Sequence, residues 1–491
     1  MNIFFISAEV FPFSKVGGLG DVCGALPPAL ARLGHAVKVI TPAYATLNRQ
    51  RYAVEKLPVR LEISLGTQNY LFSVSRWVNP ASGWHTVYFL ENAELFGARN
   101  VYTDDHGKLY PDNVARFVAF QKAALALILN QNWQPDIIHC HDNHAALIPV
   151  YLKTTYAGKP QFARTKSVLT LHNIAYQGLT PMANRPLFDL PDDLFAPMQP
   201  LEWYGKINLL KAGIVFADAV TTVSPTHARE IMEDEQLSAG LRGVLASCSE
   251  AVMGILNGVD YSYWNPAADS FIAKSYSSDK LMLKQENKRD LFIKQGLNLE
   301  LFDKPLFGMV SRLVEQKGIP LLLKGLSLIL QQGASIVILG SGEQEYEQRL
   351  QVLARQFSEQ LRVNFGHDEP LAHQIMAGAD FLLMPSRFEP CGMTQMYALR
   401  YGTVPIVHKT GGLADTVIEW DGKHGTGFCF SPYTQDAFNA AIRRAVAIFY
   451  TPEFQQMRRN GMQADFSWGQ SALKYEKLYR ELVGISHLMN L

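Results

Sequence analysis

Short apolar runs alternate with amphipathic stretches along most of the 491-residue chain. Apolar runs of this kind are typical of strands buried on both faces of a parallel sheet, and the segments between them have the apolar spacing of helices. The pattern predicts an α/β protein with doubly wound parallel sheets. The predicted strands are NIFFIS, AVKVIT, DIIHCH, SVLTLH and AVTTVS in the first half, then LFGMVS, SIVILG, RVNFG, DFLLMPS and TVPIVH in the second.

The length of the chain predicts two domains, because 491 residues exceed what one hydrophobic core usually serves. A strand-like run ends in VMGILNGVD, and a loop-rich, charged stretch follows it. We therefore predict an N-terminal domain over residues 1–255 and a C-terminal domain over 256–468. Residues 469–491 contain apolar positions at helical spacing with charge opposite, which predicts a helix packed on a core.

Composition limits the partners of the protein. Forty-five Lys and Arg balance forty-five Asp and Glu, so no overall field favours nucleic acid or an anionic membrane. No apolar run approaches the roughly 18 residues of a membrane helix, and the N-terminus lacks the basic start of a signal peptide. The five cysteines are scattered without C-x-x-C spacing, which argues against a disulfide framework or structural zinc. We expect a soluble cytoplasmic protein without nucleic-acid or membrane partners.

The stretch SKVGGLGDVCG near the N-terminus has almost the glycine spacing of a dinucleotide fingerprint, at Gly18, Gly20 and Gly24. A dinucleotide fold also requires a tight turn directly after strand one and an acid at the end of strand two. Here a longer loop intervenes, and the second strand ends in Thr-Pro. The remaining interpretation is a loop with free backbone N–H groups, flanked by Lys15 and Asp21, that suits a diphosphate or a sugar. A plain turn is the alternative.

DIIHCHDNHAA gathers three histidines, a cysteine and an aspartate. On a strand His139 and His141 share one face, so a pair of metal ligands is geometrically possible. No second ligand cluster with compatible spacing stands out, and we expect no metal site. Asp142 falls at the carboxyl end of this strand, and His172 with Asn173 at the end of the next, where open α/β sheets bind ligands.

The second half of the chain contains two further motifs. SRLVEQKG places Arg312 and Lys317 in a loop before a helix that begins near Gly318, and two cations there can hold a diphosphate. A solvated charged loop is the alternative. In MPSRFEPCGMTQMYALRYG, Glu389 precedes an expected helix start whose N–H groups can bind phosphate while the carboxylate binds sugar hydroxyls. We predict that the first turn of this helix is formed by Cys391, Gly392, Met393 and Thr394.

Together these motifs resemble glycogen synthases and starch synthases of the bacterial and plastid type, which are retaining glucosyltransferases of the GT-B fold. The resemblance runs nearly end to end, through SAEVFPFSKVGGLGDV, HCHDNH, LHNIAYQG, SRLVEQKG, SRFEPCGMTQMYALRYGTVPIV and TGGLADTV. It implies two Rossmann-like doubly wound parallel-sheet domains that face a central cleft, with the C-terminal helix crossing back to the N-terminal domain. A plastid-type member would lie in the stroma after loss of a transit peptide.

The resemblance implies transfer of glucose with retention from ADP-glucose to the non-reducing end of an α-1,4-glucan such as glycogen, starch or a malto-oligosaccharide, without cofactor or metal. The implied catalytic residues are His172, Arg312, Lys317, Glu389 and Asp142. The implied donor-binding residues are Lys15, Gly18, Asn173, Asn257, His367, Cys391, Gly392, Met393 and Thr394. The implied residues on the acceptor side are Glu9 and Asp21.

One position departs from the pattern of the family. In GHDEPLAHQ, His367 stands where an aromatic ring commonly stacks on the nucleobase. An imidazole offers less stacking area, so a synthase that uses UDP-glucose, or both donors, is an alternative. A catalytically weak glucan-binding paralogue is another, although the joint presence of Lys15, His172, Arg312 and Lys317 speaks against it.

Overall fold

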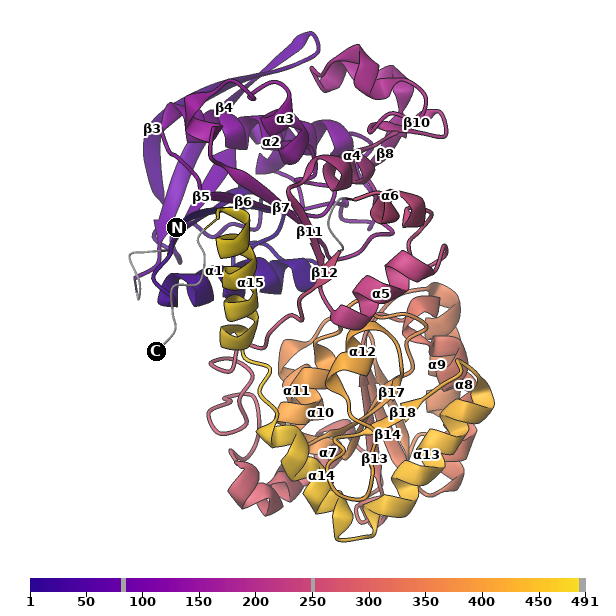
Figure 1. The fold of residues 1–491 in the computed structure, drawn as a ribbon. Coiled ribbons are helices and arrows are strands. Elements are labelled where there is room, and N and C mark those ends of the chain that lie inside the picture. The colour runs from indigo at the N-terminus through magenta and orange to yellow at the C-terminus, as the bar shows by residue number, and fades with distance from the viewer. Residues whose placement is uncertain (81–84, 249–251, 485–491) are drawn as a thin grey trace. The chain divides into compact units, whose positions relative to one another are not determined.

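The computed structural model describes residues 1–80, 85–248 and 252–484. It divides the chain into an N-terminal domain, which comprises Met1–Val223, Ala228–Gly258 and Trp468–Leu491, and a C-terminal domain, which comprises Ser224–His227 and Val259–Ser467. Each domain is a twisted sheet with helices on both faces (Figure 1). The division falls after Gly258, whereas the sequence analysis places it after residue 255.

The described residues of the N-terminal domain form a nine-stranded sheet in the order β12-β11-β7-β6-β1-β2-β5-β4-β3. Neighbours from β12 to β5 are parallel, as predicted. One edge carries an addition that the sequence analysis did not predict, where β3 and β4 form an antiparallel hairpin on β5. The buried and exposed residues of β3 alternate, because an edge hairpin leaves one face to solvent. The strands are β1 (Asn2–Ile6), β2 (Ala36–Pro42), β3 (Glu55–Leu65), β4 (Gln68–Val78), β5 (His85–Glu91), β6 (Ile137–His141), β7 (Lys166–Leu171), β11 (Ala219–Thr222) and β12 (Met253–Gly254).

The C-terminal domain contains a six-stranded sheet, counted over the described residues, in the order β15-β14-β13-β16-β17-β18. All neighbouring strands in it are parallel, which confirms the prediction for this half. Its strands are β13 (Leu306–Val310), β14 (Ser335–Leu339), β15 (Leu361–Asn364), β16 (Phe381–Met384), β17 (Val404–His408) and β18 (Phe428–Phe430). A small antiparallel sheet of the N-terminal domain, absent from the sequence prediction, consists of β8 (Leu179–Pro181), β10 (Lys206–Asn208) and β9 (Glu202–Trp203).

Helices connect the parallel strands and cover both sheets. None of those in the described part of the chain combines the length and the apolar content that crossing a bilayer requires. The N-terminal domain contains α1 (Gly18–Arg32), α2 (Asn113–Asn130), α3 (Leu147–Lys153), α4 (Leu209–Phe216), α6 (Arg242–Ala246) and α15 (Trp468–Leu482), and α5 (Pro225–Glu233) begins at the domain junction. The C-terminal domain contains α7 (Lys284–Gln295), α8 (Ile319–Gln331), α9 (Gln344–Gln356), α10 (Glu369–Gly378), α11 (Thr394–Arg400), α12 (Gly411–Thr416), α13 (Gln435–Phe449) and α14 (Glu453–Gln463).

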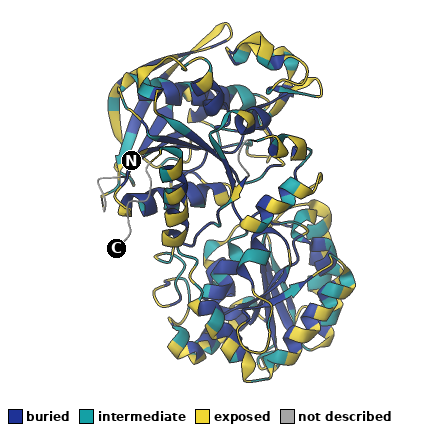
Figure 2. Cartoon of the chain, viewed as in Figure 1, coloured by how far each residue is buried: buried dark blue, intermediate teal, exposed yellow. Residues whose placement is uncertain are grey.

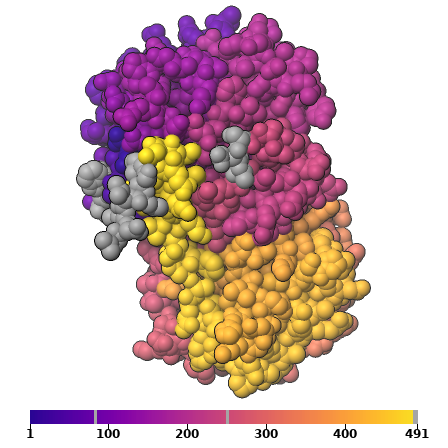
Figure 3. All heavy atoms as spheres, viewed as in Figure 1, coloured from indigo at the N-terminus to yellow at the C-terminus, as the bar shows by residue number. Residues whose placement is uncertain are grey.

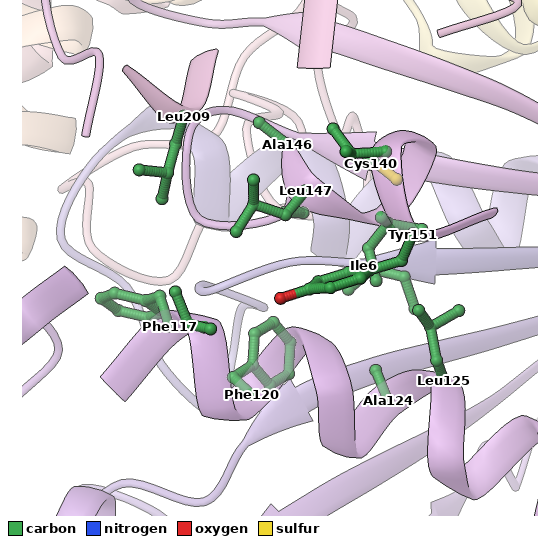
Figure 4. Close-up of a cluster of buried hydrophobic side chains, with 14 of the residues drawn as sticks. Ile6, Phe117, Phe120, Ala124, Leu125, Cys140, Ala146, Leu147, Tyr151 and Leu209 are labelled. Atoms are coloured by element: carbon green, nitrogen blue, oxygen red, sulfur yellow. The ribbon is translucent and has the colours of Figure 1, made fainter. Parts of the chain in front are cut away.

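The core of each domain lies between its sheet and the covering helices, where the central parallel strands are largely buried (Figure 2). In the N-terminal domain, Phe120 and Ala124 of α2 lie near Ile6 of β1, Cys140 of β6 and Tyr151 of α3 (Figure 4). All five side chains are buried. This packing fixes β1 and β6 beside each other, and with them the loops that follow these two strands.

The C-terminal helix α15 is part of the N-terminal domain. Its apolar face, which includes Trp468, Tyr475 and Tyr479, packs against α1 and the sheet. The hydroxyl of Tyr479 lies 2.7 Å from Nδ1 of His139 in β6. The outer face of the helix, in yellow in Figure 3, contributes to the surface of the molecule. The helix thus completes the core beneath β6.

Candidate active site

In both large sheets the strand order reverses at one point, and the candidate site residues follow the strands at that point. The N-terminal sheet reverses between β1 and β6, and Glu9 and Asp142 follow these strands. The C-terminal sheet reverses between β13 and β16, and Lys317 and Glu389 follow them. Loops leave such a switch point toward opposite faces of the sheet, which opens a crevice where α/β proteins bind ligands. Each domain therefore has its own set of candidate site residues at its switch point.

Asp142 connects the ends of the adjacent strands β6 and β7. Its Oδ1 atom accepts a hydrogen bond of 2.7 Å from the backbone N–H of His172 and a longer one of 3.4 Å from that of Asn173. Asp142 has a φ of +55°, which is unfavourable for a residue with a side chain and is held by these bonds. The structure thus brings together three residues that the sequence predicts for the site.

Burial dominates the electrostatics of these residues in the N-terminal domain. It raises the pKa of Asp142 to about 7, although the hydrogen bonds from His172 and Asn173 act in the opposite direction. The nearby carboxylate of Glu9 raises this pKa further. Burial lowers the pKa of His172 to about 3. At neutral pH the imidazole is therefore uncharged, whereas the carboxyl group is close to its titration midpoint.

Two of the three histidines of DIIHCHDNHAA, His139 and His141, are engaged in hydrogen bonds. His139 Nε2 lies 2.5 Å from the Thr170 hydroxyl, and its Nδ1 contacts Tyr479. His141 Nδ1 lies 3.0 Å from Nε2 of His172. Across residues 1–80, 85–248 and 252–484, no group of three or more His, Cys, Asp or Glu side chains is arranged to hold a metal ion. The expectation that the reaction needs no metal stays a prediction.

The glycine-rich loop of the N-terminal domain is anchored by Glu9. Oε2 of Glu9 accepts hydrogen bonds from the backbone N–H groups of Val16, at 2.6 Å, and Gly17, at 2.9 Å. Oε1 accepts a third bond of 2.7 Å from the hydroxyl of Tyr102. The expectation that the N–H groups of this loop are free is therefore wrong for Val16 and Gly17, and α1 begins directly after them at Gly18. Glu9 itself is buried, which raises its pKa.

Lys15 lies at the exposed side of this loop, where its Nζ atom is 2.8 Å from Oδ1 of Asp21. Such an exposed pair contributes little to stability and leaves the lysine available to a ligand. A pocket of about 400 Å³ opens beside it within the N-terminal domain. The residues that line this pocket are Pro12, Phe13, Ser14, Lys15, Val16, Thr46, Asn100, Val101 and Thr103.

In the C-terminal domain, Lys317 and Glu389 form an ion pair with 2.5 Å between Nζ and Oε2. The hydroxyl of Ser386 donates to the same oxygen at 3.0 Å. The pair is mostly shielded from solvent, whereas Arg312 is exposed. Gly318, with a φ of +77°, allows the two loops to meet, because a Cβ atom there would collide with the carbonyl of Pro385. The helix expected near Gly318 is α8, for which this glycine is the N-cap.

The segment after Glu389 differs from the prediction. The helix α11 begins at Thr394, so Cys391, Gly392 and Met393 form a turn before the helix and not its first turn. Gly392 has a φ of +65°, a left-handed conformation that a continuous helix cannot contain. The turn is supported by the KTGGLADTV segment, because the N–H group of Gly412 donates to the carbonyl oxygen of Glu389 at 3.1 Å.

Two predicted site residues lie apart from these contacts. His367 is exposed in the loop between β15 and α10. Asn257 is buried in the segment after β12, next to the position where the chain passes into the C-terminal domain. Oδ1 of Asn257 has no hydrogen-bond partner among the described residues. The sequence analysis missed the supporting residues Tyr102 and Ser386. Tyr102 gives no local signal, whereas Ser386 is the last residue of the predicted strand DFLLMPS.

Most of the chain matches known protein families. Residues 2–247 match the family model described as the starch synthase catalytic domain, and residues 294–462 match that of group 1 glycosyl transferases. A glycogen synthase of Myxococcus xanthus is 46% identical over 485 residues, which cover 98% of this chain and 100% of that protein.

Solved structures are similar along almost the whole chain. The catalytic domain of starch synthase IV from Arabidopsis thaliana, bound to ADP and acarbose, is 34% identical with a TM-score of 0.90, over 98% of this chain and 99% of that one. Sucrose-phosphate synthase from Thermosynechococcus elongatus, at 19% identity and a TM-score of 0.60 over 99% of this chain and 100% of that one, shares the fold alone. The chain therefore has the GT-B fold and belongs to the family of bacterial glycogen synthases and starch synthases.

Proposed function

We propose that the protein transfers glucose from ADP-glucose to the non-reducing 4-hydroxyl group of an α-1,4-glucan, with retention of the anomeric configuration. The observation that carries this proposal is the Lys317–Glu389 ion pair at the switch point of the C-terminal sheet. A cation for phosphate and a carboxylate for sugar hydroxyls are held there side by side. The names of the relatives, glycogen synthase and starch synthase, give the substrate class.

Lys317 and Arg312 are assigned to the diphosphate. As the glycosidic bond to the diphosphate breaks, negative charge develops on the leaving group, and fixed cations stabilise that charge in the transition state. Lys317 is held by Glu389, whereas the exposed Arg312 has more freedom to follow the ligand. In the proposal, Lys317 and Arg312 neutralise the negative charge of the diphosphate, and no metal or cofactor takes part.

Glu389 and the turn after it are assigned to the glucose moiety and the adjoining phosphate. Oε2 of Glu389 is engaged by Lys317 and Ser386, but Oε1 accepts no hydrogen bond from a described residue. That oxygen can accept a bond from a glucose hydroxyl. The backbone N–H groups of Cys391, Gly392 and Met393 and the side chain of Thr394 follow directly and complete this set.

The N-terminal residues are assigned to the reacting sugar and the acceptor. His172 contacts the transferred glucose, with its backbone carbonyl near the anomeric carbon, and Asn173 and Asn257 line the sugar site. The ionised form of Asp142 stabilises the positive charge of an oxocarbenium-like transition state, and no covalent intermediate is formed. The displacement then takes place on one face of the sugar, which accounts for retention.

The pocket beside Lys15 is assigned to the acceptor glucan, whereas Lys15 itself, which contributes to its lining, is assigned with Gly18 to the donor. Its volume of about 400 Å³ lies within the range of small-molecule sites, and its lining offers the hydroxyl of Ser14 and the amide of Asn100 to a sugar. In this assignment Asp21 contacts the acceptor, since its carboxylate lies 2.8 Å from Nζ of Lys15 at the pocket. Glu9 stabilises the same pocket, because its Oε2 atom accepts a hydrogen bond from the backbone N–H of Val16, which lines it.

The proposal is tested with purified protein, glycogen and ADP-[14C]glucose. We expect label in ethanol-insoluble polymer together with equimolar release of ADP. The label should be released by an exo-enzyme specific for α-1,4 linkages, because retention from an α-linked donor gives an α-linked product. Binding of glycogen without release of ADP would overturn the proposal in favour of a non-catalytic glucan-binding protein.

A second donor deserves a parallel measurement because of His367. The side chain is exposed and has less area for stacking than Tyr or Phe. UDP-glucose is therefore assayed beside ADP-glucose under identical conditions. A higher kcat/KM for UDP-glucose would replace the proposed donor and leave the proposed acceptor intact.

A further inference from the structure

The ring of His172 is held by a second histidine, His141, to which the sequence analysis assigned no role in the reaction. His141 is the last residue of β6, and His172 directly follows the adjacent parallel strand β7. His141 Nδ1 lies 3.0 Å from His172 Nε2. Asp142 binds the backbone N–H of the same residue, so His172 is fixed at its main chain and at its ring.

His141 is well placed to act on its neighbour because its own ring is immobile. It is fully buried and stacks on the ring of Phe5, with 5.3 Å between the centroids and 18° between the planes. The ring of His139 packs on it at 4.2 Å. A side chain confined in this way holds its hydrogen-bonding nitrogen in one position.

The partners of the remaining nitrogens decide which histidine donates. Nε2 of His141 is buried and has no hydrogen-bond partner among the described residues. If His172 donated, His141 would carry its proton on this nitrogen, and a buried N–H group would have no acceptor. An unpaired lone pair is more readily tolerated in a protein interior than an unpaired N–H group. The favoured arrangement therefore has the proton of His141 on Nδ1, from which it is donated to Nε2 of His172.

Both rings are neutral, as this arrangement requires. Burial lowers the pKa of His141 well below its usual value, and the neighbouring histidines lower it further. Burial also lowers the pKa of His172 to about 3. With Nε2 occupied as an acceptor, a neutral His172 carries its proton on Nδ1. Nδ1 makes no hydrogen bond to another described residue, so this N–H group is available to a ligand.

We propose that His141 is a positioning residue, which donates from Nδ1 to Nε2 of His172 and thereby holds His172 as the tautomer that presents an Nδ1–H donor to a sugar oxygen. The identity of that oxygen as part of the transferred glucose rests on the proposed function. His141 touches no substrate, and its effect on the reaction is exerted through the tautomer and the orientation of His172.

Two substitutions of His141 separate positioning from packing. His141→Phe keeps the aromatic stack on Phe5 but removes the donor. His141→Asn removes the ring but places an N–H donor on the atom bonded to Cγ, as Nδ1 is. We expect His141→Phe to lower kcat about tenfold to a hundredfold with little change in the KM for glycogen, the scale of a misplaced group at a reacting centre. We expect His141→Asn to retain kcat within a few fold although it is the less stable protein.

Tyr479→Phe is the matched control, because it removes a hydrogen bond to the adjacent His139 in the same buried cluster. We expect it to lower thermal stability and to leave kcat unchanged. A role of His141 in packing alone predicts that kcat follows stability across the three variants. The proposal predicts that the order of kcat and the order of stability differ.

The tautomer is measured directly by NMR on protein labelled with 15N-histidine, in which protonated and bare ring nitrogens have different chemical shifts. The His172 signals are assigned by their absence in His172→Asn. We expect a protonated Nδ1 and a bare Nε2 in the unsubstituted protein. A proton on Nε2, or equal kcat values for His141→Phe and His141→Asn, would overturn the proposal. If the protein transfers no glucose at all, the proposed function fails, whereas the NMR measurement still decides the hydrogen-bond direction.

Discussion

Replacement of Asp142 by Asn tests the electrostatics of the candidate residues in the N-terminal domain. The carboxyl group is 8% exposed, and burial raises its pKa from 3.8 to about 7. Asn has nearly the same shape, and its Oδ1 atom can still accept the hydrogen bond from the backbone of His172. Asp142→Asn therefore removes the charge of this side chain with little change in its packing.

The sign and size of the effect follow from the shift in pKa. Between pH 3.8 and about 7, Asp142 is ionised in the unfolded chain but protonated in the native protein. The native state thus binds the additional proton, and the free energy of unfolding falls by about 1.4 kcal/mol for each unit of rising pH. From about pH 5 to about pH 8 the loss is about 2.7 kcal/mol, and it is nearly constant at higher pH because both states are then ionised. Asp142→Asn lacks this dependence.

The assay is urea unfolding of the wild type and the variant at about pH 5 and about pH 8. The transition of the N-terminal domain is identified by hydrogen exchange of the β6 and β7 amides. We expect the stability of Asp142→Asn relative to wild type to be about 2.7 kcal/mol more favourable at the higher pH. Asp192→Asn, at a carboxylate that is 79% exposed, is the control without such a difference. An equal difference between Asp142→Asn and wild type at both pH values would refute the reasoning.

Four further outcomes test the other parts of the site. Lys317→Ala and Glu389→Ala should each lower kcat by at least about a hundredfold in steady-state assays, the scale of one lost electrostatic contact in the transition state. Arg387→Ala, which removes only an exposed ion pair on the same loop, should stay near the wild-type rate. Glu9→Gln should raise the KM for glycogen, because one amide oxygen cannot replace the carboxylate that holds two loop N–H groups and Tyr102, while an unchanged KM would contradict the anchoring role. His367→Tyr should lower the KM for the nucleotide sugar a few fold by adding stacking area, as measured with ADP-glucose and UDP-glucose.

The sequence predicted most of the central strands because each is a short apolar run between polar segments. The β3–β4 hairpin was missed, since its alternating residues lack the continuous apolar run of a buried strand. The start of α11 was misplaced because Cys391 and Met393 continue the apolar spacing of the helix. The left-handed conformation of Gly392 prevents the helix from starting before it, and the spacing of apolar residues does not reveal this conformation.

The contacts that hold the candidate residues were harder to predict than the residues themselves. Glu9 and Tyr102 are 93 positions apart, and Lys317 and Glu389 are 72 apart. No local pattern links such pairs, because their proximity depends on the order of strands in the finished sheet. Only Asp142 and His172, which follow strands that are adjacent in the sequence as well as in the sheet, could be paired in advance.

The reversal of strand order in the C-terminal sheet explains why Lys317 and Glu389 can form an ion pair. If the chain had added strands in one direction only, β13 would not have β16 as a neighbour, and the loops after these strands would lie on different parts of the edge. Because β14 is placed on one side of β13 and β16 on the other, Lys317 and Glu389 meet at the single position where a crevice opens. The N-terminal sheet has a corresponding reversal, which places β1 beside β6. The carboxylate of Glu9 is thereby brought close enough to raise the pKa of Asp142. In each domain the contacts of the candidate residues are thus a consequence of strand order, and the motifs supply the side chains that this order brings together.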